Sequence, residues 1–460
     1  MYTQGQEQYD RIYMDANVLA EGVTPEILKR LIERNEARRA RCARLKEYYR
    51  GNHAILHRVK DTRGAANQRV AANWAKYITT VSSSYLLGNP VTYDTKPEYD
   101  ISPVLDGYRR QHISSVDAQL GVDASICGVG VEHVYVDENG DPHSVAISQG
   151  TAFVVYDDTV LHRKLLGIHY YEQRDLSGAV CGYGVTAADH QWIYRYAGRE
   201  LSTLDPVGAP EEHYFGAVPF IEYRNNEERQ GDFEQQISLI DAYNTLMSDR
   251  VNDKVQFVDA FLLLLGIDID SEQAKKLREE KILMGDVDAK AEYLSKVLSE
   301  SDVEVLKKAL KDDIFATSMV PDLSDENFGN NTSGVAIKYK LLVFEQMTLG
   351  KERLFEEGLR ERLSMYIHFY SIKCNMQEVP VHEVDVHFKR NLPANELELS
   401  QIVGNLSGIA STETLLGILP FVCNAKEEAK LAAAEKAEGD KQTILTQREL
   451  MRFGDGDGTE

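Results

Sequence analysis

Hydrophobic and polar positions alternate with helical spacing in some parts of this chain and with strand spacing in others. The pattern predicts helices on both sides of a β-rich middle. Thr24 and Pro25 are a suitable N-cap and first residue for a helix that extends to about residue 50. A second helix is expected over about 69–87, because Gly88-Asn89-Pro90 is a stop signal.

Short apolar or alternating segments, which are typical of β-strands, fill the middle of the chain from about residue 120 to 223. They lie at Val131–Val136, Ser144–Ile147, Ala152–Tyr156, Leu165–Tyr171, Ala179–Val185 and Trp192–Tyr196. Asn139-Gly140 between the first two segments is a strong hairpin signal. The succession of strands predicts a meander rather than a series of β-α-β units.

Helical spacing returns after residue 232. A segment with almost no breaker residues ends in the apolar run Ala260–Leu265 and in Gly266, and we expect one long helix over it. This helix carries the carboxylates Glu234, Asp241, Asp249, Asp253 and Asp259. An acidic helix of this length suits a wall built from many copies better than an active-site pocket.

The C-terminal third is also predicted to be mainly helical. Helices are expected over Asp302–Ser318 and over Gly334–Lys373, the latter about 60 Å long at 1.5 Å per residue. Glu383–Arg390 is predicted to be a short strand and Pro393–Ala434 mainly helix. Residues after about 440 have the composition of a disordered tail.

Two groups of basic residues recur at helical spacing. The first helix carries five arginines on one face, namely Arg30, Arg34, Arg38, Arg41 and Arg44. A solvated face or a subunit contact is the favoured interpretation, and direct nucleic-acid binding is the alternative. Lys307, Lys308 and Lys311 have offsets that allow a positive strip, with a solvated face as the alternative.

Composition narrows the class of protein. The formal net charge of -22 argues against a surface that grips nucleic acid by neutralising phosphates, but not against nucleic acid passing through a repelling channel. The polar, acidic first residues and the short apolar runs predict neither a signal peptide nor a membrane span. Five cysteines without a CxxC motif are expected to be buried, reduced thiols, at Cys42, Cys127, Cys181, Cys374 and Cys423.

Motifs for catalysis, cofactors and metals are not found. The chain has no GxxxxGK[ST] and no GxSxG, and Gly128-Val129-Gly130 lacks the third glycine of a dinucleotide fingerprint. The acidic turn at Asp137–Asp141 lacks the order of a calcium loop. On a strand, His382 and His387 would point to opposite faces. We therefore expect no catalytic residue, no cofactor and no metal site.

The segment 321–333 is longer than most helix connections and rich in Asp, Asn, Gly and Ser. Asn330 and Asn331 offer neutral hydrogen-bonding groups, and Thr332 or Ser333 is a suitable cap for the next helix. An ordinary connector is one interpretation, and a functional loop is the other.

Four stretches together resemble phage portal proteins, the head-to-tail connectors of tailed bacteriophages, of the kind found in long-tailed siphophages. They lie at Leu45–Ile55 with 72–78 and Tyr85–Val91, at Ala152–Asp158, at Val218–Asn244, and at Asn330–Gly334 with the helix after it. They keep a consistent order from about residue 24 to 425, and their specificity lies in the combination.

The resemblance implies an α+β, mainly α fold with a wing, a two-helix stem, a clip and a crown, assembled as a ring of about twelve copies. The implied parts are a wing at 1–231, stem helices at 232–266 and 302–320, a clip at 267–301, a tunnel loop at 321–333, a long wing helix and strand at 334–392, a crown at 393–440 and a disordered tail at 441–460. It further implies DNA contacts by the tunnel-loop residues Asn327, Asn330, Asn331 and Thr332, and a channel lining that includes Lys307, Lys308 and Lys311.

The implied function is a channel for DNA packaging and ejection at one capsid vertex of the virion, with the host cytoplasm as the place of assembly. The implied partners are double-stranded DNA, terminase, major capsid and scaffolding proteins and head-completion or adaptor proteins, with no membrane. Two alternative hypotheses remain. One is a structural ring or scaffold that conducts no DNA. The other is a metal-dependent nuclease, which would need a compact carboxylate cluster that the spacing of Asp and Glu does not provide.

Overall fold

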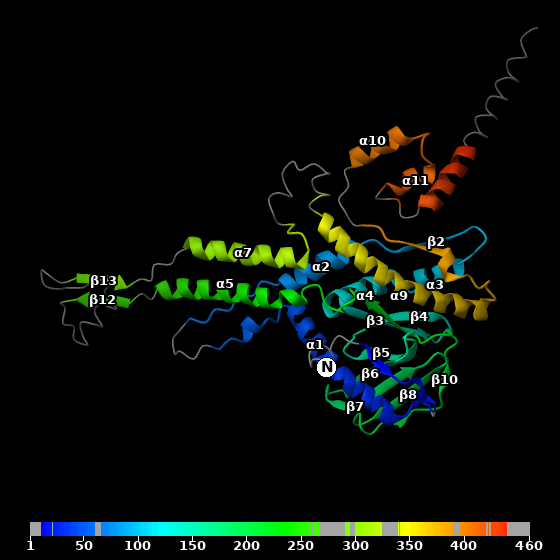
Figure 1. The fold of residues 1–460 in the computed structure, drawn as a ribbon, viewed down its shortest axis with the longest axis horizontal. Helices are drawn as coiled ribbons and strands as arrows, with labels where there is room; N and C mark the ends of the chain where they lie inside the picture. Colours follow the sequence, from blue (N-terminus) through cyan, green and yellow to red (C-terminus); the bar gives the residue numbers. More distant parts are fainter. Residues whose placement is uncertain are drawn as a thin grey trace, which may run out of the picture.

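In the computed structural model, a pair of helices projects from a body of packed helices and sheets (Figure 1). It describes residues 11–20, 22–59, 66–258, 261–265, 290–294, 300–323, 339, 341–390, 396–419, 422 and 425–438. Helix and sheet are mixed, as predicted, and helices are the larger share of the described residues.

The described N-terminal residues form the helices α1 to α4. α1 (Pro25–Arg50) confirms the first predicted helix, with the Thr24 hydroxyl accepting from the Ile27 backbone N–H at 3.4 Å. α2 (Trp74–Leu87) begins five residues later than predicted, because the Asn73 side chain caps it. α3 (Ser102–Arg110) and α4 (Ile113–Cys127) were not predicted.

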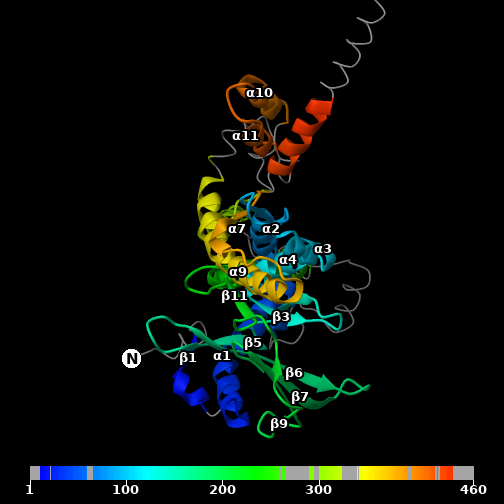
Figure 2. The ribbon, with the colours of Figure 1, turned by 90° about the vertical axis from the view of Figure 1, so that its right-hand side faces the viewer.

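The first two strands of the predicted meander lie in a separate sheet, whereas its last four strands are confirmed as neighbours in a seven-stranded sheet (Figure 2). Its strands are β1 (Ile12–Met14), β5 (Ala152–Asp157), β6 (Lys164–Arg174), β7 (Val180–Ala188), β8 (Trp192–Gly198), β9 (Asp205–Pro206) and β10 (Glu211–Glu212). β1 pairs with β5 in parallel, and the remaining pairs are antiparallel. Leu28, Leu31 and Ile32 of α1 pack against one face of this sheet.

A smaller sheet joins this layer to the rest of the body. Its order is β11 (Phe220–Arg224), β3 (Val129–Val136) and β4 (Pro142–Ile147). The predicted turn joins β3 to β4, with Gly140 at a φ of 73° and the Asp137 carboxylate accepting from the backbone N–H groups of Asn139 and Asp141. These hydrogen bonds stabilise the hairpin turn.

The long helix α9 (Leu342–Cys374) lies across the smaller sheet and α3 (Figure 1). It confirms most of the helix predicted over Gly334–Lys373, whose first residues lie outside the described part of the chain, apart from Tyr339. A short strand follows as β14 (Val384–His387), paired with β2 (Thr92–Thr95). His382 lies in a 3-10 helix before β14, so the prediction that it belongs to the strand is wrong.

A buried ionic cluster ties α9 to the elements beneath it. The Arg362 guanidinium lies 2.7 Å from the Asp117 carboxylate and 3.4 Å from that of Glu132, and all three side chains are buried. The Tyr223 hydroxyl donates to Glu132 at 2.5 Å. Burial lowers the pKa of Arg362, but the two carboxylates outweigh it and hold the pKa well above its usual value. The arginine therefore joins α9, α4 and β3 as a permanent cation.

The apolar run at the end of the predicted long helix is a strand. α5 (Ile237–Val258) ends before it, and β12 (Phe261–Leu265) pairs antiparallel with β13 (Lys290–Leu294). The prediction of helix through Leu265 is therefore wrong. Gly266 lies outside the described residues. The helix predicted over Asp302–Ser318 is confirmed as α7 (Glu300–Ser318).

The described C-terminal residues are helical, as predicted. They form α10 (Glu396–Leu406), α11 (Thr412–Gly417) and a helix over 425–438, and they lie beyond the N-terminal end of α9 (Figures 1 and 2). The tail predicted after residue 440 lies outside the described part of the chain.

The cysteines differ from the prediction of buried, reduced thiols. Cys42 of α1 and Cys127 of α4 form a disulfide with their Cα atoms 5.3 Å apart. Cys181 and Cys374 are free but exposed rather than buried. Cys423 lies outside the described residues.

Candidate DNA-contacting surface

α5 and α7 run side by side away from the body and carry the β12–β13 ribbon at their far end (Figure 1). We call α5, α7, β12 and β13 the projection. Its base lies against α2, where the Trp74 ring is 5.8 Å from that of Tyr243 and 5.3 Å from that of Phe315. Edge-on aromatic packing of this kind fixes the angle at which both helices leave the body.

The start of the segment after α7 is held by the same aromatic group. The Tyr77 hydroxyl donates to the Pro321 carbonyl at 3.1 Å and accepts from the Leu323 backbone N–H at 2.9 Å. The candidate DNA-contacting residues Asn327, Asn330, Asn331 and Thr332 follow this anchor and lie outside the described residues. Their contacts with DNA stay a prediction.

A row of buried polar side chains binds α5 to an extended segment of the body. Asn244, Ser248 and Asn252 lie on one face of α5 at four-residue spacing. Their oxygens accept, in order, from the backbone N–H groups of Ala72 (2.8 Å), Val70 (2.9 Å) and Gln68 (2.6 Å). The helix thus satisfies every second N–H of residues 68–72, as a neighbouring strand would. This row was not predicted, because its only signal in the sequence is small polar residues four apart in a helix.

The carboxylates predicted for a wall of many copies are used within the chain. Glu234 binds Arg41, Asp241 accepts from the Tyr48 hydroxyl at 2.8 Å, and Asp249 pairs with Arg58 at 2.8 Å. These three carboxylates are thus partly neutralised within the chain, and their place in a wall of many copies stays a prediction. Asp259 lies outside the described residues.

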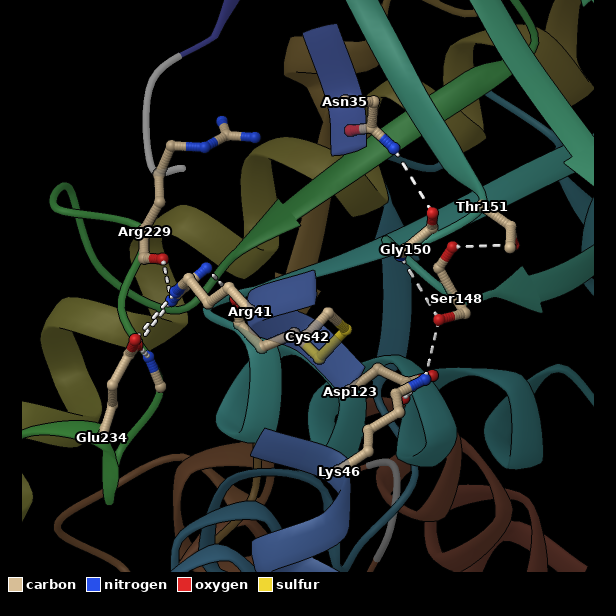
Figure 3. Close-up of a disulfide and its surroundings, with 12 residues drawn as sticks. Asn35, Arg41, Cys42, Lys46, Asp123, Ser148, Gly150, Thr151, Arg229 and Glu234 are labelled. Atoms are coloured by element: carbon tan, nitrogen blue, oxygen red, sulfur yellow. Dashed lines mark hydrogen bonds and ion pairs between the residues drawn. A yellow bond between two sulfur atoms is a disulfide. The ribbon is translucent and has the colours of Figure 1, made fainter. Parts of the chain in front are cut away.

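The arginine face of α1 is also not a single solvated surface. Arg30, Arg34 and Arg44 are exposed, but Arg38 and Arg41 are only 2% and 4% exposed. Arg41 reaches Glu234 with two hydrogen bonds, from Nε at 2.7 Å and from Nη2 at 2.5 Å (Figure 3). It also donates to the backbone carbonyls of Cys127 and Arg229, each at 3.1 Å.

We call the region where Arg41 joins α1 to the end of α4 and to the segment before α5 the junction. A second buried ion pair lies beside it. The Lys351 ammonium of α9 contacts both oxygens of Asp232 and donates to the Ser82 hydroxyl at 2.6 Å. Asp232 also accepts from Ser125 at 2.6 Å and from Asn225 at 2.7 Å. Burial alone would raise the pKa of Asp232, but Lys351 and these donors lower it. The residue before the projection is thus fixed to α2, α4 and α9.

Close backbone contacts complete the junction. Gly128 has a φ of 82°, and a Cβ there would lie 1.9 Å from the Arg229 carbonyl oxygen. A Cβ at Gly231 would lie 2.2 Å from the Ile126 carbonyl oxygen. Only glycine allows the segment before the projection to lie directly on the end of α4.

Glu222, a residue that the sequence analysis did not single out, gives the body a defined response to acid. Its carboxylate binds Arg229 at 2.8 and 3.0 Å and accepts from the Tyr156 hydroxyl at 2.9 Å. Burial raises the pKa of Glu222, but Arg229 outweighs it and brings the pKa to about 2. The stabilisation is therefore complete above the ordinary pKa of about 4.5 and is lost as the pH falls toward 2.

We expect Glu222→Gln to remove about 3 kcal/mol of stability at pH 7, because Arg229 holds the pKa of Glu222 at about 2, below its usual 4.5. Urea unfolding between pH 7 and pH 3 measures the effect. The stability of the variant should fall less steeply with acid than that of the parent, whereas Glu228→Gln, at an exposed position nearby, should leave the pH profile unchanged. Parallel profiles for parent and Glu222→Gln would contradict the assignment.

The three candidate lysines differ in their surroundings. Lys307 and Lys311 lie one turn apart and face carboxylates, Lys307 that of Glu304 at 3.5 Å and Lys311 that of Asp322 at 2.5 Å. The hydrogen bond with Asp322 raises the pKa of Lys311. Lys308 is exposed and forms no ion pair with a described residue. The described contacts therefore leave Lys308 as the member with a free charge, and the role of all three as channel lining stays a prediction.

The described residues contain no group of three or more His, Cys, Asp or Glu side chains placed to hold a metal ion. Within the same residues, no helix combines the length and the apolarity that crossing a membrane requires.

Known proteins match nearly the whole chain. The family model described as phage portal protein, SPP1 Gp6-like, matches residues 28–442. A portal protein of Clostridium phage phiCD119 is 23% identical over 442 residues, which cover 89% of this chain and 96% of that protein. The portal protein of Bacillus phage SPP1 is 23% identical over 385 residues, which cover 80% of this chain and 76% of that protein.

Among solved structures, a chain from the neck of an empty GTA particle, computed with C6 symmetry, aligns with a TM-score of 0.41 and 11% identity over 75% of this chain and 89% of that chain. The family match spans most of the sequence and includes the body, the junction and the projection. This chain belongs to the phage portal proteins, in the SPP1 Gp6-like family. The resemblance to siphophage portal proteins is thereby confirmed.

Proposed function

We propose that this protein assembles as a ring of about twelve copies at one capsid vertex, with a channel for double-stranded DNA during packaging and ejection. The family match over residues 28–442 is the observation that carries the proposal. The projection supports it, because paired helices that leave a compact body can line a channel once several copies stand side by side (Figure 1).

The parts of such a ring can be assigned to this chain. We assign the wing to 1–231 and to α9 with its strand (334–392), the stem to 232–266 and 302–320, and the clip to 267–301. The tunnel loop is 321–333, the crown 393–440 and the tail 441–460. α5 and α7 are then the two stem helices, and the β12–β13 ribbon leads from α5 into the clip.

A low-friction lining agrees with the charge of the chain. Each phosphate neutralised by a lysine adds affinity, and a ring multiplies that contribution. The net charge of -22 argues against a surface that holds DNA tightly by neutralising its phosphates. Isolated lysines, with Lys308 as the exposed one, and the neutral tips of Asn327, Asn330, Asn331 and Thr332 would touch DNA without holding it.

The same proposal places the protein in the virion after assembly in the host cytoplasm. Terminase would dock on the ring during packaging, and head-completion or adaptor proteins would dock afterwards. Major capsid and scaffolding proteins would surround the wing.

Electron microscopy of the purified full chain tests the assembly. We expect rings with an axial hole about as wide as a DNA duplex. Rings without an axial hole would favour the structural scaffold, and monomers that hydrolyse DNA would favour the nuclease; either result would refute the proposal.

A charge change in the tunnel loop tests the lining. Replacing Asn330, Asn331 and Thr332 with lysine should slow DNA packaging at least several-fold and make the rate depend more steeply on salt, because each copy gains three phosphate contacts. Packaging of DNA into proheads by terminase is the measurement, with Asn→Gln and Thr→Ser changes at the same positions as the neutral control. An unchanged rate in rings of normal appearance would exclude DNA contact by these residues.

A further inference from the structure

The disulfide between Cys42 and Cys127 lies at the junction through which the body holds the projection (Figure 3). Cys42 follows Arg41 in α1, and Cys127 is the last residue of α4. Arg41 donates to the Cys127 backbone carbonyl at 3.1 Å and binds Glu234, which lies just before α5. The covalent bond and the arginine thus connect the same two helices to the base of the projection.

A second polar contact joins α1 to α4, on the opposite side of the disulfide from Arg41. One turn further along α1, Lys46 lies 3.5 Å from the Asp123 carboxylate of α4 and donates to the Ser148 hydroxyl at 2.9 Å (Figure 3). The disulfide sits between this contact and the Arg41–Glu234 pair. It therefore fixes the register of α1 on α4 at the point where the ionic contacts depend on that register.

We propose that Cys42 and Cys127 form a redox latch, open as two thiols in a reducing cytoplasm and closed as a disulfide once the protein is in an oxidising medium. Reducing compartments keep thiols reduced, and extracellular conditions favour disulfides. The inference does not depend on the protein conducting DNA.

Closure by a small-molecule disulfide, such as oxidised glutathione, balances without another reactant. One cysteine loses its proton, and its thiolate attacks a sulfur of the reagent and expels one glutathione thiolate. The second cysteine, as a thiolate, then attacks the mixed disulfide and expels the other. The protein loses two electrons and two protons, and the reagent becomes two thiols.

Burial controls the rate of this reaction. Cys42 and Cys127 are each 1% exposed, so exchange requires a local opening of the α1–α4 crossing. Cys181 and Cys374 are exposed and should react at once. The latch should therefore close slowly in the folded protein and resist mild reductants afterwards.

The stabilising effect follows from the length of the closed loop. The two cysteines are 85 residues apart, and the loop between them contains α2, α3 and most of α4. Cross-linking so long a loop restricts the unfolded chain strongly, so closure should raise Tm by on the order of 5 °C. Hydrogen exchange at the start of α5 should slow as well, because the bond holds Arg41 against Glu234.

The test uses full-length protein lacking the other three cysteines (Cys181→Ser, Cys374→Ser and Cys423→Ser), prepared with reductant and then incubated with oxidised glutathione. Alkylation after denaturation, followed by peptide mass spectrometry, should show the Cys42 and Cys127 peptides linked after oxidation. Tm and hydrogen exchange at 234–250 should change in the linked protein and revert after reduction in denaturant and refolding.

The matched control adds Cys42→Ala and Cys127→Ala, which should abolish the response to glutathione. If the control does not fold, the comparison of oxidised and reduced protein with both cysteines intact still decides the matter. Thiols that remain alkylatable after prolonged oxidation and in assembled particles would overturn the proposal. A linked peptide with no change in Tm or hydrogen exchange would overturn it equally.

Discussion

Replacing Arg362 with methionine is expected to lower the free energy of unfolding by about 5 kcal/mol, the largest effect of any single change that we describe. The change leaves the Asp117 and Glu132 carboxylates buried without their cation. Burial already raises the pKa of Asp117 while Arg362 opposes it, so loss of the arginine should raise that pKa further. Urea unfolding at pH 7 is the measurement.

Arg353→Met in the same helix is the matched control, because Arg353 is exposed, and it should change stability by about 0.5 kcal/mol or less. Should Arg362→Met give no soluble protein, Arg362→Lys keeps the charge without the fork and should fall between the two. Equal stability of Arg362→Met and Arg353→Met would refute the role of the cluster.

Asp232→Ala is expected to cost about 4 kcal/mol, because it leaves the buried Lys351 ammonium without its partner and removes the acceptor of Ser125 and Asn225. Thermal unfolding gives the magnitude. The loss should be local at first, so hydrogen exchange over 225–240 should rise before the rest of the body unfolds.

The second change at this site separates charge from packing. Asp232→Ala combined with Lys351→Met should recover part of the lost stability, because methionine leaves no buried charge without a partner. Asp313→Ala on the exposed side of α7 controls for the loss of one negative charge. A double variant no more stable than Asp232→Ala would contradict the argument.

Local signals in the sequence were sufficient to predict the elements whose ends are fixed by a capping or turn residue. Thr24 caps α1, and Asn139-Gly140 turns β3 into β4, and both depend on residues at most four apart. α4 carries no comparable signal, since serines, aspartates and a glycine interrupt its apolar positions. It forms because its neighbours in space bury it, which a single sequence does not reveal.

The errors have the same physical origin. The apolar run Phe261–Leu265 fits helix and strand equally, and its strand partner Lys290–Leu294 comes about 30 residues later. Arg41 shares a helical period with solvated arginines, but its partner Glu234 is 193 residues away. Cys42 and Cys127 are joined across 85 residues. Patterns along the chain predict faces, whereas the partner of a face depends on the tertiary fold.

The candidate site could likewise be predicted only in part from the sequence. The resemblance identified the family from the order of four stretches, and the family match confirms it. It could not identify the side chains that hold the projection, such as Asn244 and Ser248, because these bind backbone groups and leave no trace in charge or hydrophobicity.

The way the projection is fixed has a mechanical consequence. α5 has 22 residues and is thus about 33 Å long, and its hydrogen bonds to the body extend along it as far as Asn252. A sideways force on the β12–β13 ribbon acts as a torque on the aromatic contacts of Trp74 and on the hydrogen bonds made by the row from Asn244 to Asn252. These hydrogen bonds hold α5 against residues 68–72 in one register. A load at the tip of the projection is therefore shared between the segment 68–72 and α2, rather than resisted within α5 alone.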